Sequence, residues 1–87
     1  MATGPKIAQQ AKEQLVQLTG LKPYTVSALR KDEEGWHVTV ELIELERIPE
    51  ATDVLATYET LLDDEGNLLR YQRTKRYYRA EIMEQEA

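Results

Sequence analysis

The side chains best suited to chemistry in this chain are carboxylates in its central part. Acid–base catalysis of the glycosidase type needs two carboxyl groups that face each other across a cleft. These carboxylates occupy the polar positions of β-patterned runs, so we expect them on the solvent faces of strands, in a chain too short for a deep pocket. The sequence therefore predicts no enzyme. The carboxylates considered are Glu41, Glu44, Glu46, Glu50, Asp53 and Glu59.

The other reactive residue types are too few for a catalytic or metal centre. The chain has one histidine, His37, one serine, Ser27, and no cysteine. We expect His37 on the polar face of its strand, and a structural zinc site would need four ligands of these types. The acidic loop at 63–67 lacks the ligand spacing of a calcium loop, and the isolated glycines make no phosphate loop. We therefore expect neither metal nor cofactor.

A run of arginines and tyrosines lies near the end of the sequence. Such residues grip single-stranded nucleic acid, but they are also enriched at protein–protein hot spots. A further interpretation is that these cations pair with carboxylates of neighbouring strands, at about 0.2–1 kcal/mol per pair. We rank a protein partner first, internal pairing second and nucleic acid third. The predicted partner-binding residues are Arg70, Tyr71, Arg73, Arg76, Tyr77, Tyr78 and Arg79, with Glu41, Glu44 and Glu59 on an acidic sheet face.

Charge is unevenly distributed along the 87 residues, which carry a net charge of −5. Residues 1–69 have a net charge of −7, residues 70–80 have five cations and no anion, and residues 81–87 have three anions. The acidic majority would repel a polyanion. No apolar run approaches the roughly 18 residues of a membrane span, and the first residues do not resemble a signal peptide. We expect one domain over residues 1–87, in the cytoplasm.

The first element is predicted to be an amphipathic helix over residues 6–19. Its apolar stripe consists of Ile7, Ala11, Leu15 and Leu18, at spacings of four, four and three. Pro5 suits the first turn, and Gly20 is a natural C-terminal stop. The opposite face, with Gln10, Glu13 and Gln17, is expected to be solvated.

The rest of the sequence predicts an antiparallel sheet of about four strands and an acidic tail. In the second strand the apolar positions change phase after Leu42, which predicts a bulge or sharp twist there. Trp36 is expected in the core, because its strand alternates apolar and polar residues. Helix and sheet together give an α+β fold, in which the helix covers the sheet. The strands are expected at 23–31, 36–47, 53–62 and 67–79, and the tail at 80–87.

The sequence resembles the gas vesicle protein O family over about residues 12–80. The resemblance rests on the combination of an Arg-Ile-Pro break, a Tyr-Glu strand and an Arg-Tyr tail. The matching segments are 35–38, 41–44, 46–49, 53–59, 62–63 with Gly66, 71–73 and 76–79.

The resemblance implies a non-enzymatic accessory role in gas vesicle formation. The implied partners are other gas vesicle proteins: further accessory proteins, with the aggregation-prone shell protein as an additional candidate. No catalytic residue carries over from this family. The implied location is the cytoplasm, with attachment to the vesicle left open, as is the oligomeric state. The alternative hypothesis is a small regulatory protein that binds nucleic acid through Arg70–Arg79.

Overall fold

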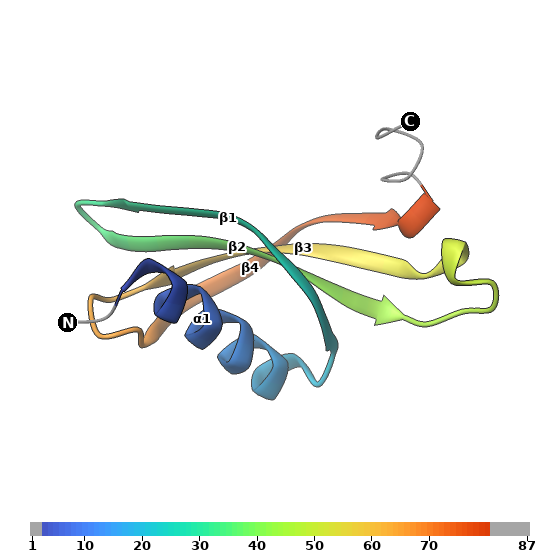
Figure 1. Cartoon of the computed structure of the whole chain (residues 1–87), viewed down its shortest axis with the longest axis horizontal. Coiled ribbons are helices and arrows are strands. Elements are labelled where there is room, and N and C mark those ends of the chain that lie inside the picture. The colour runs from blue at the N-terminus through green and yellow to red at the C-terminus, as the bar shows by residue number, and fades with distance from the viewer. Residues whose placement is uncertain (1–2, 81–87) are drawn as a thin grey trace.

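The computed structural model describes residues 3–80 and shows one helix and a four-stranded antiparallel sheet (Figure 1). The strands follow one another across the sheet in chain order, β1-β2-β3-β4, as a meander. The α+β prediction is therefore confirmed. The elements are α1 (Gly4–Thr19), β1 (Lys22–Asp32), β2 (Gly35–Leu45), a short 3-10 turn η1 (Glu50–Thr52), β3 (Val54–Leu62) and β4 (Leu68–Tyr78).

The observed elements differ from the expected ranges by at most two residues at each end. The helix begins at Gly4 rather than residue 6, and β2 ends at Leu45 rather than residue 47. β2 ends two residues earlier than expected because the chain leaves the sheet after Leu45, before the Arg47–Pro49 break. The expected acidic tail lies outside the described residues, apart from Ala80.

The helix ends where the sequence predicts and packs through most of the expected stripe. Gly20 adopts a left-handed conformation (φ 74°) and donates its N–H to the carbonyl of Val16 at 2.8 Å. Ile7, Ala11 and Leu15 are fully buried. Leu18 was expected beside them, but 59% of it is exposed, because the last turn of α1 extends beyond the strands that cover the other turns (Figure 1).

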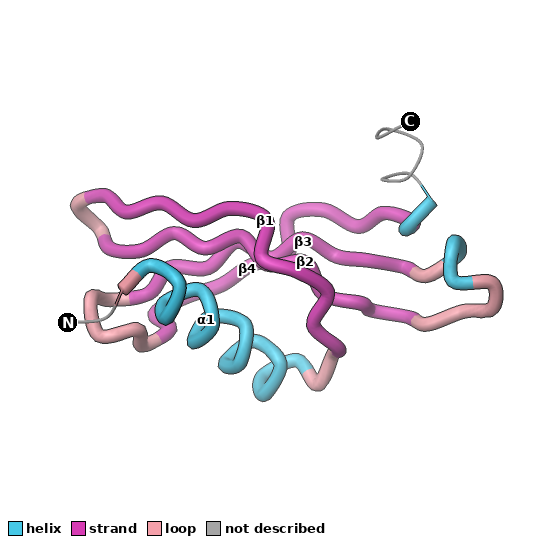
Figure 2. Tube along the Cα trace, viewed as in Figure 1, coloured by secondary structure: helices cyan, strands magenta, loops and turns pink. Residues whose placement is uncertain are grey.

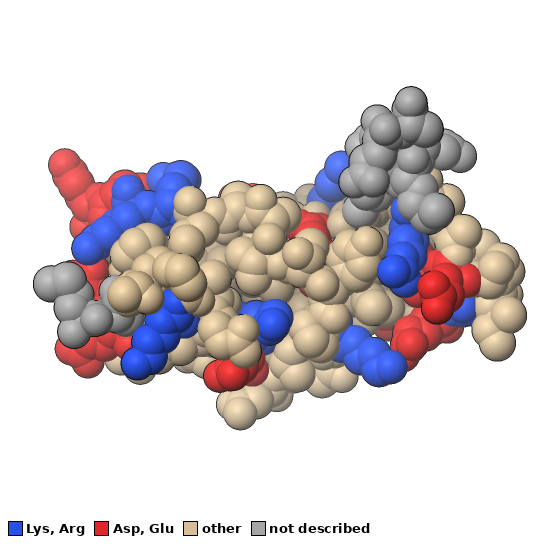
Figure 3. All heavy atoms as spheres, in the orientation of Figure 1, with Lys and Arg blue, Asp and Glu red and all other residues tan. Residues whose placement is uncertain are grey.

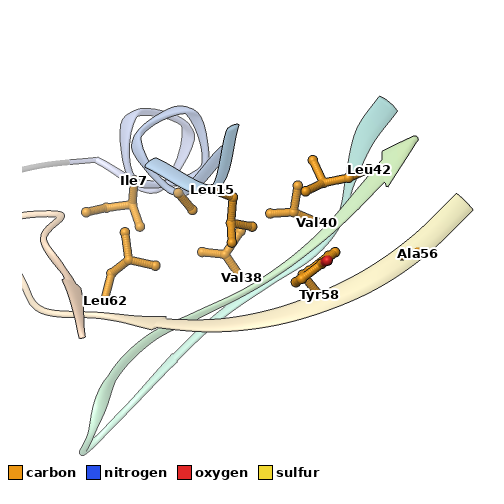
Figure 4. Close-up of a cluster of buried hydrophobic side chains, with 9 residues drawn as sticks. Ile7, Leu15, Val38, Val40, Leu42, Ala56, Tyr58 and Leu62 are labelled. Carbon is orange, nitrogen blue, oxygen red and sulfur yellow. The ribbon is translucent and has the colours of Figure 1, made fainter. Parts of the chain in front are cut away.

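The main core lies between α1 and one face of the sheet (Figure 4). Each large side chain buried there stabilises the fold by about 1.5–3 kcal/mol. Trp36 packs against the edge of this core, as expected. The helix contributes Ile7, Ala11 and Leu15, and the sheet contributes Val38, Val40, Leu42, Ala56, Tyr58 and Leu62.

The helix is also tied to the β3–β4 hairpin by one glutamine. Gln14 donates its side-chain N–H to the carbonyl of Gly66 at 2.8 Å and accepts the N–H of Leu68 at 3.0 Å. Gln10 packs beside it, so closely that a Cβ at Gly66 (φ 90°) would collide with its amide. Gln10 was expected to be solvated, but it is half-buried, because the hairpin folds over this side of the helix.

Bulges bend and twist the sheet along its length (Figure 2). The one in β2 falls between Ile43 and Leu45, which confirms the predicted irregularity just after Leu42. The two edge strands, β1 and β4, each carry two register shifts in their pairing. Irregular edges discourage pairing with a further strand. The molecule is elongated, with extents of 42 × 28 × 19 Å, and α1 lies under one half of the sheet (Figure 1).

Candidate partner-binding surface

The predicted Arg70–Arg79 segment lies on edge strand β4 up to Tyr78, and alternation divides these strand residues between the two faces of the sheet. Tyr71, Arg73, Arg76 and Tyr78 pair with residues of β3 that share the helix-side face of Ala56 and Tyr58. Arg70, Lys75 and Tyr77 pair with residues of the other face. The run is therefore two half-surfaces rather than one patch. The residues on β3 that set the helix-side parity are Val54, Ala56, Tyr58 and Thr60.

On the helix-side face, Glu44 binds two arginines of β4. Its two carboxylate oxygens lie 2.8 Å from Nη1 of Arg73 and 3.1 Å from Nε of Arg76. The Glu44 side chain is only 13% exposed, whereas those of Arg73 and Arg76 are 51% and 58% exposed. The hydrogen bond to Glu44 raises the pKa of Arg73. Glu44 is the residue of the β2 bulge, so the bulge directs it toward β4.

At the end of β4, Asp53 binds Arg79 and closes the β2–β3 connection. Its carboxylate lies 3.2 Å from Nη1 of Arg79 and accepts the N–H of Arg47 at 2.7 Å, while its carbonyl accepts the N–H of Arg79 at 2.9 Å. The hydrogen bond to Asp53 raises the pKa of Arg79. Asp53 was expected on a solvent face, but it is 3% exposed because this loop folds over it.

On the opposite face, Glu41 is buried in a cage of hydroxyl groups. It accepts hydrogen bonds from Thr57 at 2.5 Å, Ser27 at 2.7 Å and Tyr77 at 2.6 Å. The expectation that Glu41 is solvated is wrong, because it is 6% exposed and Tyr77, 8% exposed, reaches across β3 to it. Burial, and then the bond to Glu41, raise the pKa of Tyr77. Neither side chain is accessible to a partner.

Two further predicted residues remain exposed near the hairpin end of β4. Arg70 pairs with Glu34 at 3.2 Å, and both side chains are more than half exposed. Glu59 is exposed and has no ion pair within residues 3–80. Arg70 and Glu59 border a shallow depression of about 160 Å³. The second-ranked interpretation was that the arginines pair with carboxylates of the protein itself. Such ion pairs are formed by Arg70, Arg73, Arg76 and Arg79.

One group of side chains in the β1–β2 hairpin has the composition of a cation site. Asp32, Glu34 and His37 place one ligand atom each within 4.8 Å of one another. The hairpin itself explains their positions. Asp32 binds Arg30 at 3.0 Å and His37 at 2.9 Å, and Glu34 binds Arg70. Partial desolvation opposes ionisation of Asp32, but hydrogen bonds from His37, the Glu34 N–H and Arg30 outweigh it and lower the pKa to about 2.

The end of the sheet remote from the hairpins presents exposed apolar side chains. Leu45, Val54 and Tyr78 lie side by side across β2, β3 and β4, and Leu45 and Tyr78 are 44% and 52% exposed. Ile48, in the adjoining loop, is fully exposed. We call Leu45, Arg47, Ile48, Val54, Arg76 and Tyr78 the open-end surface.

Sequence reasoning found only part of the open-end surface. The predicted partner-binding residues include Arg76 and Tyr78 but not Leu45, Arg47, Ile48 or Val54. A usable signal was present, because Ile48 is an apolar residue between Arg47 and Pro49 in a strand-breaking loop.

Figure 3 shows one face of the molecule, with charges of both signs toward its two ends and a largely uncharged middle. The face of the molecule seen in Figure 3 is therefore mixed in charge and not uniformly basic.

Comparisons with known proteins give one consistent result. The family model of gas vesicle synthesis protein GvpO matches residues 2–83. Gas vesicle protein O of Streptomyces sp. (strain CB03234) is 40% identical over 74 residues, which cover 85% of this chain and 58% of the relative. Gas vesicle protein O1 of Halobacterium salinarum is 33% identical over 54 residues, covering 62% and 45%.

A third relative, gas vesicle protein O of Haloferax mediterranei, is 35% identical over 52 residues, covering 60% of this chain and 37% of the relative. The chain therefore spans about half the length of the curated relatives it matches. No solved structure gives a significant match. Within residues 3–80, the helix is too short and too polar to cross a membrane.

Proposed function

The chain belongs to the gas vesicle protein O family, and from that premise we propose that it is a non-enzymatic accessory factor that binds other gas vesicle proteins as vesicles form. It acts in the cytoplasm, on or beside the vesicle. The observation that carries this proposal is the contrast between buried carboxylates and exposed apolar and cationic side chains. Glu41, Glu44 and Asp53 are largely buried and bound by the protein, whereas apolar and cationic side chains at the open end of the sheet are exposed.

The state of the carboxylates supports a role other than catalysis. Of the six central carboxylates, Glu59 is the one without an ion pair or side-chain hydrogen bond inside residues 3–80. Glu41 is saturated by three hydroxyl groups, and Glu44 and Asp53 are bound by arginines. General acid–base chemistry needs a carboxyl group directed at a substrate. Glu41, Glu44 and Asp53 are therefore directed at the protein itself, while Glu46 and Glu50 are exposed beside Lys22 and Arg79.

The exposed arginines and tyrosines support a protein partner. Arg73, Arg76 and Tyr78 are each about half exposed and lie on one face of β4, beside exposed Leu45. Arginine and tyrosine dominate binding hot spots when an apolar surround excludes water. Glu41 and Tyr77 drop out of the proposed contact set because they are buried. The set that remains is Arg70, Tyr71, Arg73, Arg76, Tyr78, Arg79, Glu44 and Glu59.

The alternative, a nucleic-acid-binding regulator, receives less support. Three arginines of β4, and Arg79 just after it, are already bound to carboxylates, and the chain carries a net charge of −5. Binding to single strands would fall steeply with salt concentration. We expect no shift of labelled single-stranded DNA or RNA at low salt. A salt-dependent shift that is lost on mutation of the β4 arginines would favour the alternative.

The test of the proposal is a pull-down of the proteins encoded in a gas vesicle gene cluster. Arg76→Ser with Tyr78→Ser removes one paired cation and one half-exposed aromatic side chain from the open-end surface. The matched control, Leu29→Ser with Arg30→Ser, removes one paired cation and one partly exposed apolar side chain from edge strand β1. Both proteins should keep the circular dichroism spectrum of the wild type.

We expect the wild type and the Leu29/Arg30 control to capture at least one gas vesicle protein, and the Arg76/Tyr78 variant to lose it. Capture by all three proteins alike would remove the binding site from this face. Failure of the wild type to capture any protein of the cluster would remove the proposed function itself.

A further inference from the structure

A groove of about 240 Å³ opens at the end of the sheet that α1 does not reach. It is lined by Arg47, Val54, Arg76, Tyr77 and Tyr78, which come from the β2–β3 connection, the start of β3 and the end of β4. Small-molecule sites usually enclose about 300–1,000 Å³. The groove is below that range and is open, so it fits one large side chain of a macromolecular partner better than a free small ligand.

Cations outnumber carboxylates around this groove. Six cations and four carboxylates lie at this end of the sheet, and one of the cations, Lys75, lies over the ring of Tyr77, 5.3 Å from its centroid. Lys22 pairs with Glu46, Arg73 and Arg76 share Glu44, and Arg79 lies between Asp53 and Glu50. Arg47 forms no ion pair with any residue between 3 and 80, although it lines the groove. A second guanidinium, that of Arg76, lines it as well.

Apolar side chains flank the two guanidinium groups. Val54 lies between Leu45 and Tyr78 in the register of the sheet, and both neighbours are about half exposed. Ile48, which follows Arg47 in the loop, is fully exposed. Guanidinium groups bind carboxylates with two parallel hydrogen bonds, and the apolar strip offers a large side chain a contact away from water.

We propose that this groove binds an acidic segment of a partner protein in which a carboxylate stands next to a large apolar side chain. The carboxylate is bound by Arg47 and Arg76, and the apolar side chain packs on Tyr78, which is half exposed beside the largely buried Val54. The proposal rests on the proposed function and specifies the partner segment's chemistry: acidic and apolar together. Charge complementarity is the argument for this occupant, because Arg47 lacks a carboxylate among the described residues.

The experiment is an NMR titration of the ¹⁵N-labelled full chain with three acetylated and amidated pentapeptides. The first alternates glutamate and leucine (Glu-Leu-Glu-Leu-Glu), the second has glutamine in place of glutamate, and the third has serine in place of leucine. We expect the first peptide to give saturable shifts of the backbone amides of Arg47, Val54 and Tyr78 by about 1 mM. The second and third should bind at least about fivefold more weakly, a difference of roughly one ionic or apolar contact.

A matched pair of variants ties the binding to the groove. Arg47→Ser removes the unpaired guanidinium, and we expect at least a fivefold loss of affinity for the first peptide. Arg30→Ser removes an exposed arginine from β1 and should leave that affinity unchanged. Equal binding of all three peptides, no saturable shift by about 1 mM, or equal loss in both variants would overturn the proposal.

The titration and the pull-down fail in different ways. If the peptides do not bind but the Arg76/Tyr78 variant still loses its gas vesicle partner, the proposed function stands and the acidic, apolar segment is wrong. If the first peptide binds through Arg47 but no gas vesicle protein is captured, the groove is a peptide site and the proposed function is wrong.

Discussion

Tyr77 of β4 donates a hydrogen bond of 2.6 Å to the buried carboxylate of Glu41 on β2, across the intervening strand β3. The sequence predicts Tyr77 as part of a basic binding surface and Glu41 as part of a separate acidic one. In the structure the two side chains instead contact each other inside the protein. The bond joins an edge strand to the centre of the sheet, on the face opposite α1, where no helix within residues 3–80 covers the strands.

We expect Tyr77→Phe to lower the free energy of unfolding by about 1–3 kcal/mol, because the substitution leaves a buried carboxylate with one hydroxyl donor fewer. Urea denaturation at pH 7 measures this. Tyr78→Phe is the control and should change stability little, because Tyr78 is half exposed. Equal stability of the Tyr77 variant and the wild type would show that Glu41 does not depend on this bond.

A second prediction concerns alkaline pH. Burial, followed by the bond to Glu41, raises the pKa of Tyr77 above the usual value of about 10. A group whose folded-state pKa is raised contributes stability that is complete below its unfolded pKa and is lost as pH rises toward the folded one. Burial also raises the pKa of Tyr58, so part of the loss remains without Tyr77.

We therefore expect the stability of the wild type to fall above about pH 10, and that of Tyr77→Phe to fall less steeply. Urea denaturation between about pH 8 and pH 11 compares the two proteins. Parallel curves for the two proteins would contradict the assignment of this titration to Tyr77.

A third prediction concerns the β2–β3 connection. Asp53→Asn keeps the shape of the side chain but removes the negative charge that binds Arg79. Hydrogen bonds to charged groups contribute about 1.5–3 kcal/mol, so we expect a loss of that size at pH 7. Glu50→Gln is the control, because Glu50 is 85% exposed and lies 3.9 Å from Arg79. If both variants were equally stable, Asp53 would not hold the connection.

A fourth prediction separates stability from binding. Glu44→Gln removes the carboxylate that Arg73 and Arg76 share, so we expect a less stable protein. The same change leaves two guanidinium groups without their anion beside the groove. The Glu-Leu peptide should then bind about three- to tenfold more tightly, as expected for one charge in water. Weaker binding by this variant, in the same titration, would contradict the placement of the groove.

The fold could be predicted from sequence because its signals are local. Helix periodicity, Gly20 as a stop and the alternation of four strands each depend on neighbouring residues. The phase change after Leu42 predicted the bulge, which leaves Glu44 outside the regular pairing. The prediction that Leu18 is buried was wrong, because its exposure depends on where the sheet ends, which is not a local property.

The residue types of the candidate site could be predicted from the sequence, but their arrangement in space could not. Alternation marks Glu41 as polar, and only the twist of the sheet and the reach of Tyr77 bury it. The hydroxyl donors Ser27, Thr57 and Tyr77 come from three different strands, so no spacing in the sequence reveals the cage. The division of the arginines between two faces depends on register shifts in β4 that its sequence does not mark.

We propose that this protein supports gas vesicle formation through the open end of its sheet. The most direct measurement is rescue of vesicle formation in a host whose gas vesicle gene cluster lacks this gene, scored by electron microscopy at equal levels of soluble protein. We predict rescue by the wild type and by the Leu29→Ser, Arg30→Ser control, and no rescue by the Arg76→Ser, Tyr78→Ser variant. Full rescue by the Arg76/Tyr78 variant would contradict a role for the open-end surface, and vesicles formed without the gene would contradict a role for the protein.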